Sequence, residues 1–204
     1  TLADRVEILL VRHLQKNPGT SFIDLETELN NSFPGLMTPG QELVRTILES
    51  YGKEMEKTWS LHELDTPANR MMEMDAASRA LQDIAARLGF ICSKGETSRL
   101  LQWLDAGQPA YSFHILASAV TGKLFHSTRE SGGQSNLVLP AERIPLLTYK
   151  LAHDPSLQIK AVTWNVLSFA KLEAMNSFPM LNKDIWRQEL AGSHRENLEQ
   201  LKLF

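Results

Sequence analysis

Basic side chains in the second half of the chain are the residues best suited by type to contact phosphate groups. Lys and Arg neutralise phosphate charge and donate hydrogen bonds to phosphate oxygens. Lys123 and Arg129 share one expected helix, residues 117–130. Arg143 and Lys150 lie two turns apart on the next expected helix, residues 141–153, and therefore on similar sides of it. The alternative interpretation is ordinary solvated helix surface. The predicted nucleic-acid-binding set is Lys123, Arg129, Arg143, Lys150 and Lys160.

Residue types for nucleophilic or metal-dependent catalysis are sparse. The six histidines lie far apart without the spacing of a zinc site, and the single cysteine, Cys92, leaves too few thiols for a cysteine-rich one. The sequence contains no glycine-rich phosphate loop and no nucleophile-elbow motif. We therefore expect no cofactor, no bound metal and no catalytic residue.

Length and composition predict a globular protein of one domain or two small ones, since the chain has 204 residues and 43% of them are hydrophobic. One cysteine excludes an intrachain disulfide and favours a reducing, cytoplasmic setting. No segment approaches the roughly 18 apolar residues that span a bilayer, and the first residues lack the layout of a signal peptide, so no membrane partner is expected. Because the chain starts at Thr1 rather than at methionine, we expect it to be a piece of a longer protein.

The net charge argues against a strongly electrostatic nucleic-acid binder. It is −3 at pH 7, whereas such proteins usually carry a basic excess. Residues 1–95 hold about 10 basic and 14 acidic side chains, and residues 96–204 hold about 11 and 10. The second half is therefore slightly the more positive, and neither half is a basic tail.

Three short helices with tight connections are expected in the first quarter of the chain. Apolar residues recur at helical spacing in residues 2–15, 20–33 and 39–51, with Pro or Gly between the segments. A short strand-like piece follows the third helix. This layout indicates a winged-helix-like module over residues 1–65, whose third helix would present Arg45 to a DNA groove; a packed helical subdomain is the alternative.

A mixed arrangement of strands and helices is expected for residues 66–204. Thr66 and Pro67 begin a long helix that Gly89 ends. The expected strands are 90–93, 99–104, 110–116, 136–139 and 159–166, and the expected helices are 117–130, 141–153, 167–175 and 184–203. The predicted fold class is α/β, or α+β when both modules are counted.

Four segments of this second half carry a resemblance. They are LLQW at residues 100–103, YSFHI at 111–115, ASAVTGKL at 117–124 and LVLPAERIPLL at 137–147. In combination they resemble the restriction-endonuclease-like superfamily, PD-(D/E)XK, and more closely a bacterial domain found with DNA methyltransferases and restriction systems. The resemblance implies a restriction-endonuclease-like mixed sheet flanked by helices over residues 66–204.

Active members of that superfamily carry an acidic residue on the second strand and an acidic pair, or an acid and a lysine, on the third. These groups hold Mg²⁺ against the scissile phosphate. The matching positions here are Leu100, His114 and Leu116, none of which is a carboxylate. The resemblance therefore implies a vestigial site without nuclease activity. Strand alternation places His114 on one face with Ser112 and Leu116, either as a contact to a phosphate or partner or as a hydrogen-bonded structural residue.

The function implied by the resemblance is a non-catalytic DNA-binding or target-positioning module of a bacterial restriction-modification or defence system. DNA and a protein such as a DNA methyltransferase are the expected partners. The alternative is a protein-interaction or assembly domain that docks onto a methyltransferase or self-associates. An active Mg²⁺-dependent nuclease, with ligands displaced to Glu96, Asp105 or Glu130, is the interpretation that the sequence favours least.

Overall fold

The structure, a computed structural model, describes residues 1–35, 38–97, 99–127 and 132–201. Its first part contains α1 (Leu2–Lys16), β1 (Thr20–Ser21), α2 (Phe22–Ser32), α3 (Gln41–Tyr51), β2 (Gly52–Met55) and β3 (Thr58–Leu61). The side chains of Thr1 and Ser21 accept hydrogen bonds from backbone N–H groups in the first turns of α1 and α2, as helix caps do. The three strands form one antiparallel sheet in the order β1-β3-β2.

The rest of the chain alternates helices with a second sheet. Thr66 caps α4 (Pro67–Leu88), and Gly89 ends it with a φ of 76°, a left-handed conformation that glycine adopts readily. The later elements are β4 (Ile91–Lys94), β5 (Leu100–Asp105), β6 (Gln108–Ile115), α5 (Gly122–Ser127), β7 (Gln134–Leu139), a 3₁₀ turn (Ala141–Arg143), α6 (Ile144–His153), α7 (Pro155–Ala161), β8 (Asn165–Ser168), α8 (Phe169–Ser177) and α9 (Lys183–Leu201).

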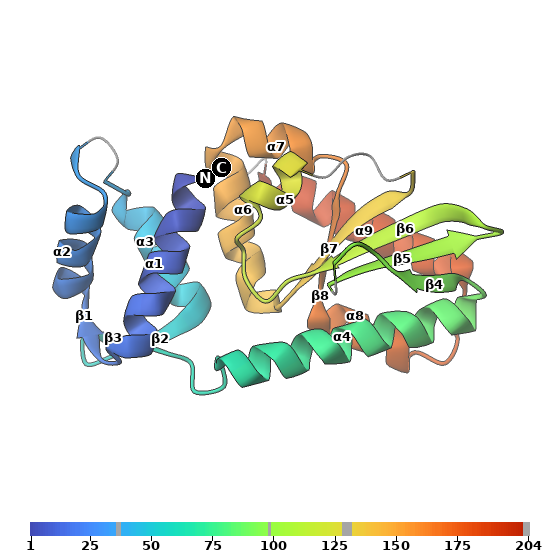
Figure 1. Ribbon diagram of the computed structural model, residues 1–204, viewed down its shortest axis with the longest axis horizontal. Coiled ribbons are helices and arrows are strands. Elements are labelled where there is room, and N and C mark those ends of the chain that lie inside the picture. The colour runs from blue at the N-terminus through green and yellow to red at the C-terminus, as the bar shows by residue number, and fades with distance from the viewer. Residues whose placement is uncertain (36–37, 98, 128–131, 202–204) are drawn as a thin grey trace.

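The second sheet has five strands in the order β4-β5-β6-β7-β8. β4, β5 and β6 pair antiparallel, whereas β7 pairs parallel with both β6 and β8. Helices flank this mixed sheet on both faces (Figure 1). The expected mixed α/β class is therefore confirmed. Among the described residues, no helix is both long enough and apolar enough to cross a bilayer.

Two predicted elements differ from those in the structure. The expected strand 159–166 is wrong, because residues 155–161 form α7 and the strand lies later, at Asn165–Ser168. Asp154 accepts hydrogen bonds from the N–H groups of Ser156 and Leu157, and Pro155 occupies the first turn, so local capping overrides the β-branched residues. The expected helix 117–130 begins only at Gly122, because residues 117–119 form bends and the segment is hydrogen-bonded to Glu7 and Asp4 of α1. The predicted end of that helix lies outside the described residues.

Each face of the five-stranded sheet contributes to a different apolar cluster. Phe113 and Ile115 lie in the cluster with α4, α8 and α9, and Leu137 lies in the cluster with α6 and α7. Leu116 packs against this second cluster. The alternation predicted for β6 is therefore confirmed.

The N-terminal helices share their apolar core with one face of the sheet. Val6, Leu10 and Leu48 belong to the same cluster of buried side chains as Leu137 and Leu146. Figure 1 shows α6 between the N-terminal helices and the sheet, with α4 running beneath α6 and the sheet. The predicted division at residue 65 stays a prediction, but the junction it would create is a packed apolar layer rather than an open linker.

Candidate functional site

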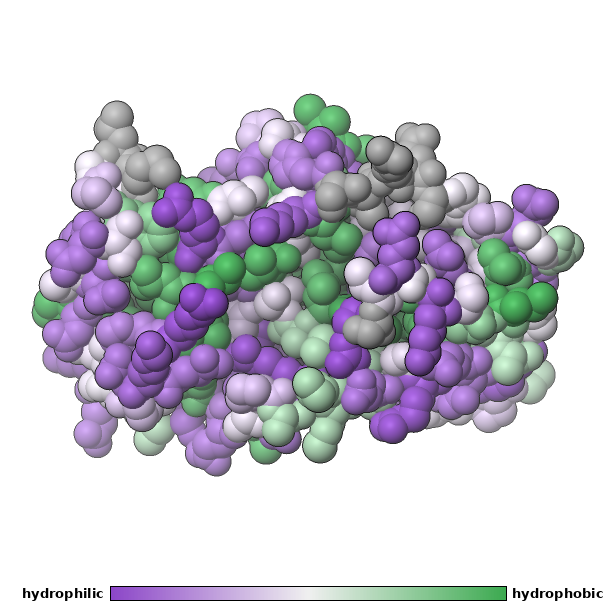
Figure 2. Space-filling view, viewed as in Figure 1, coloured by the Kyte–Doolittle hydropathy of each residue, from purple (hydrophilic) through white to green (hydrophobic). Residues whose placement is uncertain are grey.

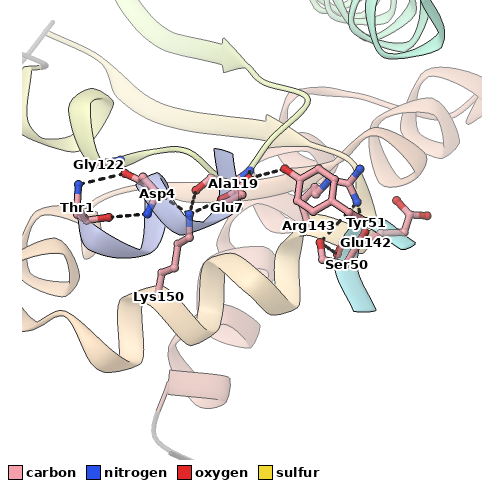
Figure 3. Close-up of polar contacts among 10 residues, drawn as sticks. All are labelled: Thr1, Asp4, Glu7, Ser50, Tyr51, Ala119, Gly122, Glu142, Arg143 and Lys150. Carbon is pink, nitrogen blue, oxygen red and sulfur yellow. Dashed lines mark hydrogen bonds and ion pairs between the residues drawn. The ribbon is translucent and has the colours of Figure 1, made fainter. Parts of the chain in front are cut away.

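A fully buried lysine lies at the junction between α1 and α6. Lys150 points from α6 toward α1, where its Nζ atom lies 2.7 Å from Oδ1 of Asp4 and also donates to Oε2 of Glu7 (Figure 3). It donates a third hydrogen bond, 2.9 Å long, to the carbonyl oxygen of Ala119. An ammonium has three protons to donate, so every one of them has an acceptor.

The two carboxylates also hold the segment between β6 and α5. Oε1 of Glu7 accepts from the N–H of Ala119 at 3.0 Å, and Oδ2 of Asp4 accepts from the N–H of Gly122 at 3.0 Å. Burial pushes the pKa of Asp4 upward, but the charge and hydrogen bond of Lys150, the N-terminal ammonium and the N–H of Gly122 together leave this pKa below its usual value. Asp4 and Glu7 therefore act as anionic acceptors that position the start of α5.

A second buried network lies beside the first. It has two arginines around one carboxylate, whereas the first has two carboxylates around one lysine. Asp65 accepts from Nη2 of Arg143 at 2.6 Å through one carboxylate oxygen, and from Nε of Arg70 at 2.5 Å through the other. Arg143 also donates to the carbonyl oxygen of Ser50, and the hydroxyl of Ser50 donates to the carbonyl oxygen of Glu142 at 2.7 Å. These bonds fasten α3 to the turn that precedes α6.

Tyr51 joins the two networks. Its hydroxyl donates to Oε1 of Glu7, and the guanidinium of Arg143 lies 3.5 Å from the centre of its ring. Burial, followed by the nearby charge of Glu7, raises the pKa of Tyr51 well above its usual value. The phenol therefore remains a hydrogen-bond donor at neutral pH.

The two networks differ in formal charge. Two carboxylates, Asp4 and Glu7, face the ammonium of Lys150, and the amino group of Thr1 lies 3.5 Å from Oδ2 of Asp4 as a second cation, so this group is balanced in formal charge. Two cations, Arg70 and Arg143, share one carboxylate, so that group carries one excess positive charge. Tyr51, which donates to Glu7 and lies against the guanidinium of Arg143, separates the balanced group from the positive one.

This arrangement corrects part of the predicted nucleic-acid-binding set. Arg143 and Lys150 were expected to face solvent, but they are only 4% and 2% exposed. A buried charge must be paired, and both cations are already paired with carboxylates of the N-terminal part. Neither residue can reach a phosphate in this conformation.

The other predicted basic residues lie in three places. Arg45 is exposed on α3, far along the chain from the rest. Lys123 on α5 and Lys160 on α7 are exposed on two helices that pack against each other, and Nζ of Lys160 lies 2.6 Å from Nδ1 of His126. Arg129 lies outside the described residues. Among the described members of the set, Lys123 and Lys160 are an exposed pair on adjoining helices, and their contact with nucleic acid stays a prediction.

The proposed vestigial positions form part of the packed sheet. Leu100 on β5 lies directly opposite His114 on β6, and the imidazole of His114 lies 5.1 Å from the ring of Trp164. Burial lowers the pKa of His114 to about 4, so the ring is neutral at pH 7. Among the described residues, no group of three or more His, Cys, Asp or Glu side chains is arranged to hold a metal ion.

A basic groove, which the sequence analysis did not identify, runs between α1 and α2. Its volume is about 600 Å³, and four basic side chains line it while Glu28 is the one carboxylate among the described lining residues. We define it by Arg5, Arg12, His13 and Lys16. Figure 2 shows hydrophilic side chains projecting around apolar ones over α1 and α2.

The two faces of α1 explain why this groove is basic. Asp4 and Glu7 turn inward to Lys150, whereas Arg5, Arg12 and Lys16 lie on the exposed face. The spacing of these three basic residues, seven and four positions, keeps them on one side of a helix. The spacing of Arg5, Arg12 and Lys16 can be read from the sequence. It indicates a basic face, however, only once Asp4 and Glu7 on the same helix are known to be buried.

Comparison with known proteins gave no matching family model, no matching curated protein and no matching solved structure.

Proposed function

We propose that this chain is a non-catalytic DNA-binding module and that duplex DNA lies along the basic groove. The observation that carries the proposal is the concentration of Arg5, Arg12, His13 and Lys16 around one groove of a chain whose net charge is −3. Such a local cluster neutralises phosphates and releases counterions even when the whole protein is acidic. The acids of α1 do not oppose it because they are buried against Lys150.

The order of elements in the N-terminal part supports this proposal. A helix, a short strand, two helices and two further strands in one sheet are the elements expected of a winged helix. The expected recognition helix, α3, is nevertheless packed against α6 and bears Glu42 and Glu49 on its exposed side. We therefore assign the main phosphate contacts to α1 rather than to α3.

The side chains at the centre of the five-stranded sheet support the proposed absence of catalysis. The strand order of residues 91–139 is the one expected of a restriction-endonuclease-like core, but Leu100, His114 and Leu116 supply no carboxylate at its centre. We propose that chemistry is supplied by a partner such as a DNA methyltransferase, within a bacterial restriction-modification or defence system in the cytoplasm. Purified protein is expected to leave plasmid DNA uncut in the presence of Mg²⁺, and Mg²⁺-dependent cleavage would overturn this part of the proposal.

The test of DNA binding compares two variants of equal charge. The triple variant Arg5→Gln, Arg12→Gln, Lys16→Gln removes three cations from the groove, and Lys57→Gln, Arg79→Gln, Lys94→Gln removes three exposed cations elsewhere. Fluorescence anisotropy with a labelled duplex should show wild-type binding at about 50 mM salt, and the groove variant should reduce the salt slope by about 3. Absence of wild-type binding, or an equal loss in the control variant, would contradict the proposal.

A second candidate function, assembly, is favoured by a groove of opposite charge. A cavity of about 500 Å³ between α4 and α8 is lined by Glu73, Asp83, Glu142 and Glu173, with Arg79 as the one basic residue among the described lining residues. Its charge complements the basic groove of another copy of this chain, so we propose head-to-tail self-association as the alternative. Sedimentation at low and high salt tests it: a species that remains monomeric at low salt excludes this mode.

A further inference from the structure

A small pocket lies beside the basic groove on α1. Its volume is about 220 Å³, and α1, Tyr51, the start of α4 and the segment between β6 and α5 enclose it. Arg12 lines both the groove and the pocket, so the two are adjacent. The polar residues that line it include Arg12, Gln15, Arg70 and Ser118.

The pocket is electrostatically suited to an anion. Glu7 is the one carboxylate among its described lining residues, and its side chain is only 1% exposed. Both of its oxygens are occupied, one by Tyr51 and the N–H of Ala119, the other by Lys150. The carboxylate therefore has little capacity left to neutralise the arginines that line the pocket.

One guanidinium nitrogen of Arg70 has no hydrogen-bond acceptor among the described residues. Its Nε atom binds Asp65, but that carboxylate is shared with Arg143. Its Nη2 atom is buried without a hydrogen-bond partner among the described residues. A buried guanidinium nitrogen without an acceptor is destabilising, and an anion with several oxygens is the ligand that relieves it.

The size of the pocket limits the ligand to a group rather than a whole nucleotide. A volume of about 220 Å³ is below the roughly 300 Å³ at which pockets for complete small molecules begin. We propose that the pocket binds one phosphate group through Arg12 and Arg70, with Gln15 and Ser118 as neutral partners. The assignment of its source rests on the proposed function. The phosphate is the one at the 5′ end of a DNA strand whose backbone follows the basic groove.

The first arm of the test uses inorganic phosphate alone and so does not depend on DNA binding. Amide NMR shifts of Gln15, Ser118 and Val120 should change with phosphate but not with chloride at equal ionic strength. Arg12→Gln should weaken this response about tenfold, the loss expected for one charge-assisted contact. Arg5→Gln is the matched control, because Arg5 lines the groove but not the pocket. Absence of a phosphate response, or an equal response in Arg12→Gln, overturns the phosphate site.

The second arm identifies the source of the phosphate. A duplex with a 5′-phosphate should bind about tenfold more tightly than the same duplex with a 5′-hydroxyl. Arg12→Gln should lose this preference, whereas Arg5→Gln should weaken both duplexes alike and keep it. Equal binding of the two duplexes by wild-type protein overturns the DNA end as the source, even where inorganic phosphate binds. Thermal unfolding of each variant confirms that exposed Arg12 can be replaced without loss of the fold.

Discussion

The Nζ atom of Lys150 lies 2.7 Å from Oδ1 of Asp4, although 146 positions of the chain separate the two residues. This pair joins α6, which packs on the sheet, to α1, whose opposite face forms the basic groove. The position of the groove relative to the rest of the molecule therefore depends on a buried ion pair.

Replacing Lys150 with methionine should strongly destabilise the protein. The change keeps an apolar stem of similar length but leaves Asp4 and Glu7 buried without their cation. Removal of one partner from a buried ion pair costs about 3–5 kcal/mol. Urea denaturation should show this loss, whereas Lys160→Met, at an exposed position, should change the free energy of unfolding by about 0.5 kcal/mol or less. Similar losses in both variants would contradict the structural role of Lys150.

Replacing Tyr51 with phenylalanine tests the link between the two networks. The ring under Arg143 is retained, but Glu7 loses the hydroxyl that donates to it. Oε1 of Glu7 keeps the N–H of Ala119, so the cost is that of one hydrogen bond to a charged group, about 1.5–3 kcal/mol. Tyr149→Phe is the control, since Tyr149 is half-buried rather than fully buried, so a loss below about 1 kcal/mol is expected.

The same variant carries a pH signature. The pKa of Tyr51 in the folded protein is raised well above 10.0, its usual value. Above pH 10 the unfolded chain releases this proton while the folded chain keeps it, so stability falls as pH rises. Tyr51→Phe should reduce that alkaline loss in urea titrations. An unchanged alkaline profile would show that Tyr51 titrates normally.

Local signals in the sequence were sufficient for several elements. Thr66, Pro67 and Gly89 define both ends of α4, and period-two alternation assigns Phe113 and His114 to opposite faces of β6. These features depend on neighbours within a few positions. The mixed α/β class and the succession of strands along residues 91–139 follow from these local signals.

The environment of Lys150 could not be predicted in the same way. Helical spacing placed Arg143 and Lys150 on similar sides of one helix, but whether that side meets solvent or another helix is decided by tertiary packing. Its acidic partners lie more than 140 positions away on α1. The basic groove was missed for the same reason, since Arg5 and Arg12 stand out only when Asp4 and Glu7 are known to face inward.

The pKa of His114 predicts a loss of stability in acid. The folded imidazole has a pKa of about 4, against 6.5 in an exposed chain. Between these values the unfolded chain binds a proton that the folded chain does not, so stability falls as pH decreases from 6.5 toward 4. The difference amounts to about 3 kcal/mol at most.

Urea denaturation from pH 7 to 4 checks this prediction. His114→Leu should show a smaller acid loss than wild type, because the unfolded variant has no imidazole to protonate at that position. His62→Leu serves as the control, because His62 is exposed and should keep the wild-type profile. If His114→Leu follows wild type across this range, protonation of His114 does not limit acid stability.

The shared core predicts that the two halves unfold together. Trp59 lies in the N-terminal part and Trp164 directly before β8, yet both belong to one apolar cluster with Leu10 and Leu146. Thermal unfolding followed by tryptophan fluorescence and by far-ultraviolet circular dichroism should therefore give coincident transitions. Leu10→Ala should lower the free energy of unfolding by about 2–5 kcal/mol and shift both signals together.

Residues 66–204 produced alone should expose the face around Leu146 and bind a hydrophobic dye, because α1 and α3 no longer cover it. Two separate transitions, or a stable fragment that binds no dye, would instead favour independent modules and would release the basic groove from its fixed position beside the sheet.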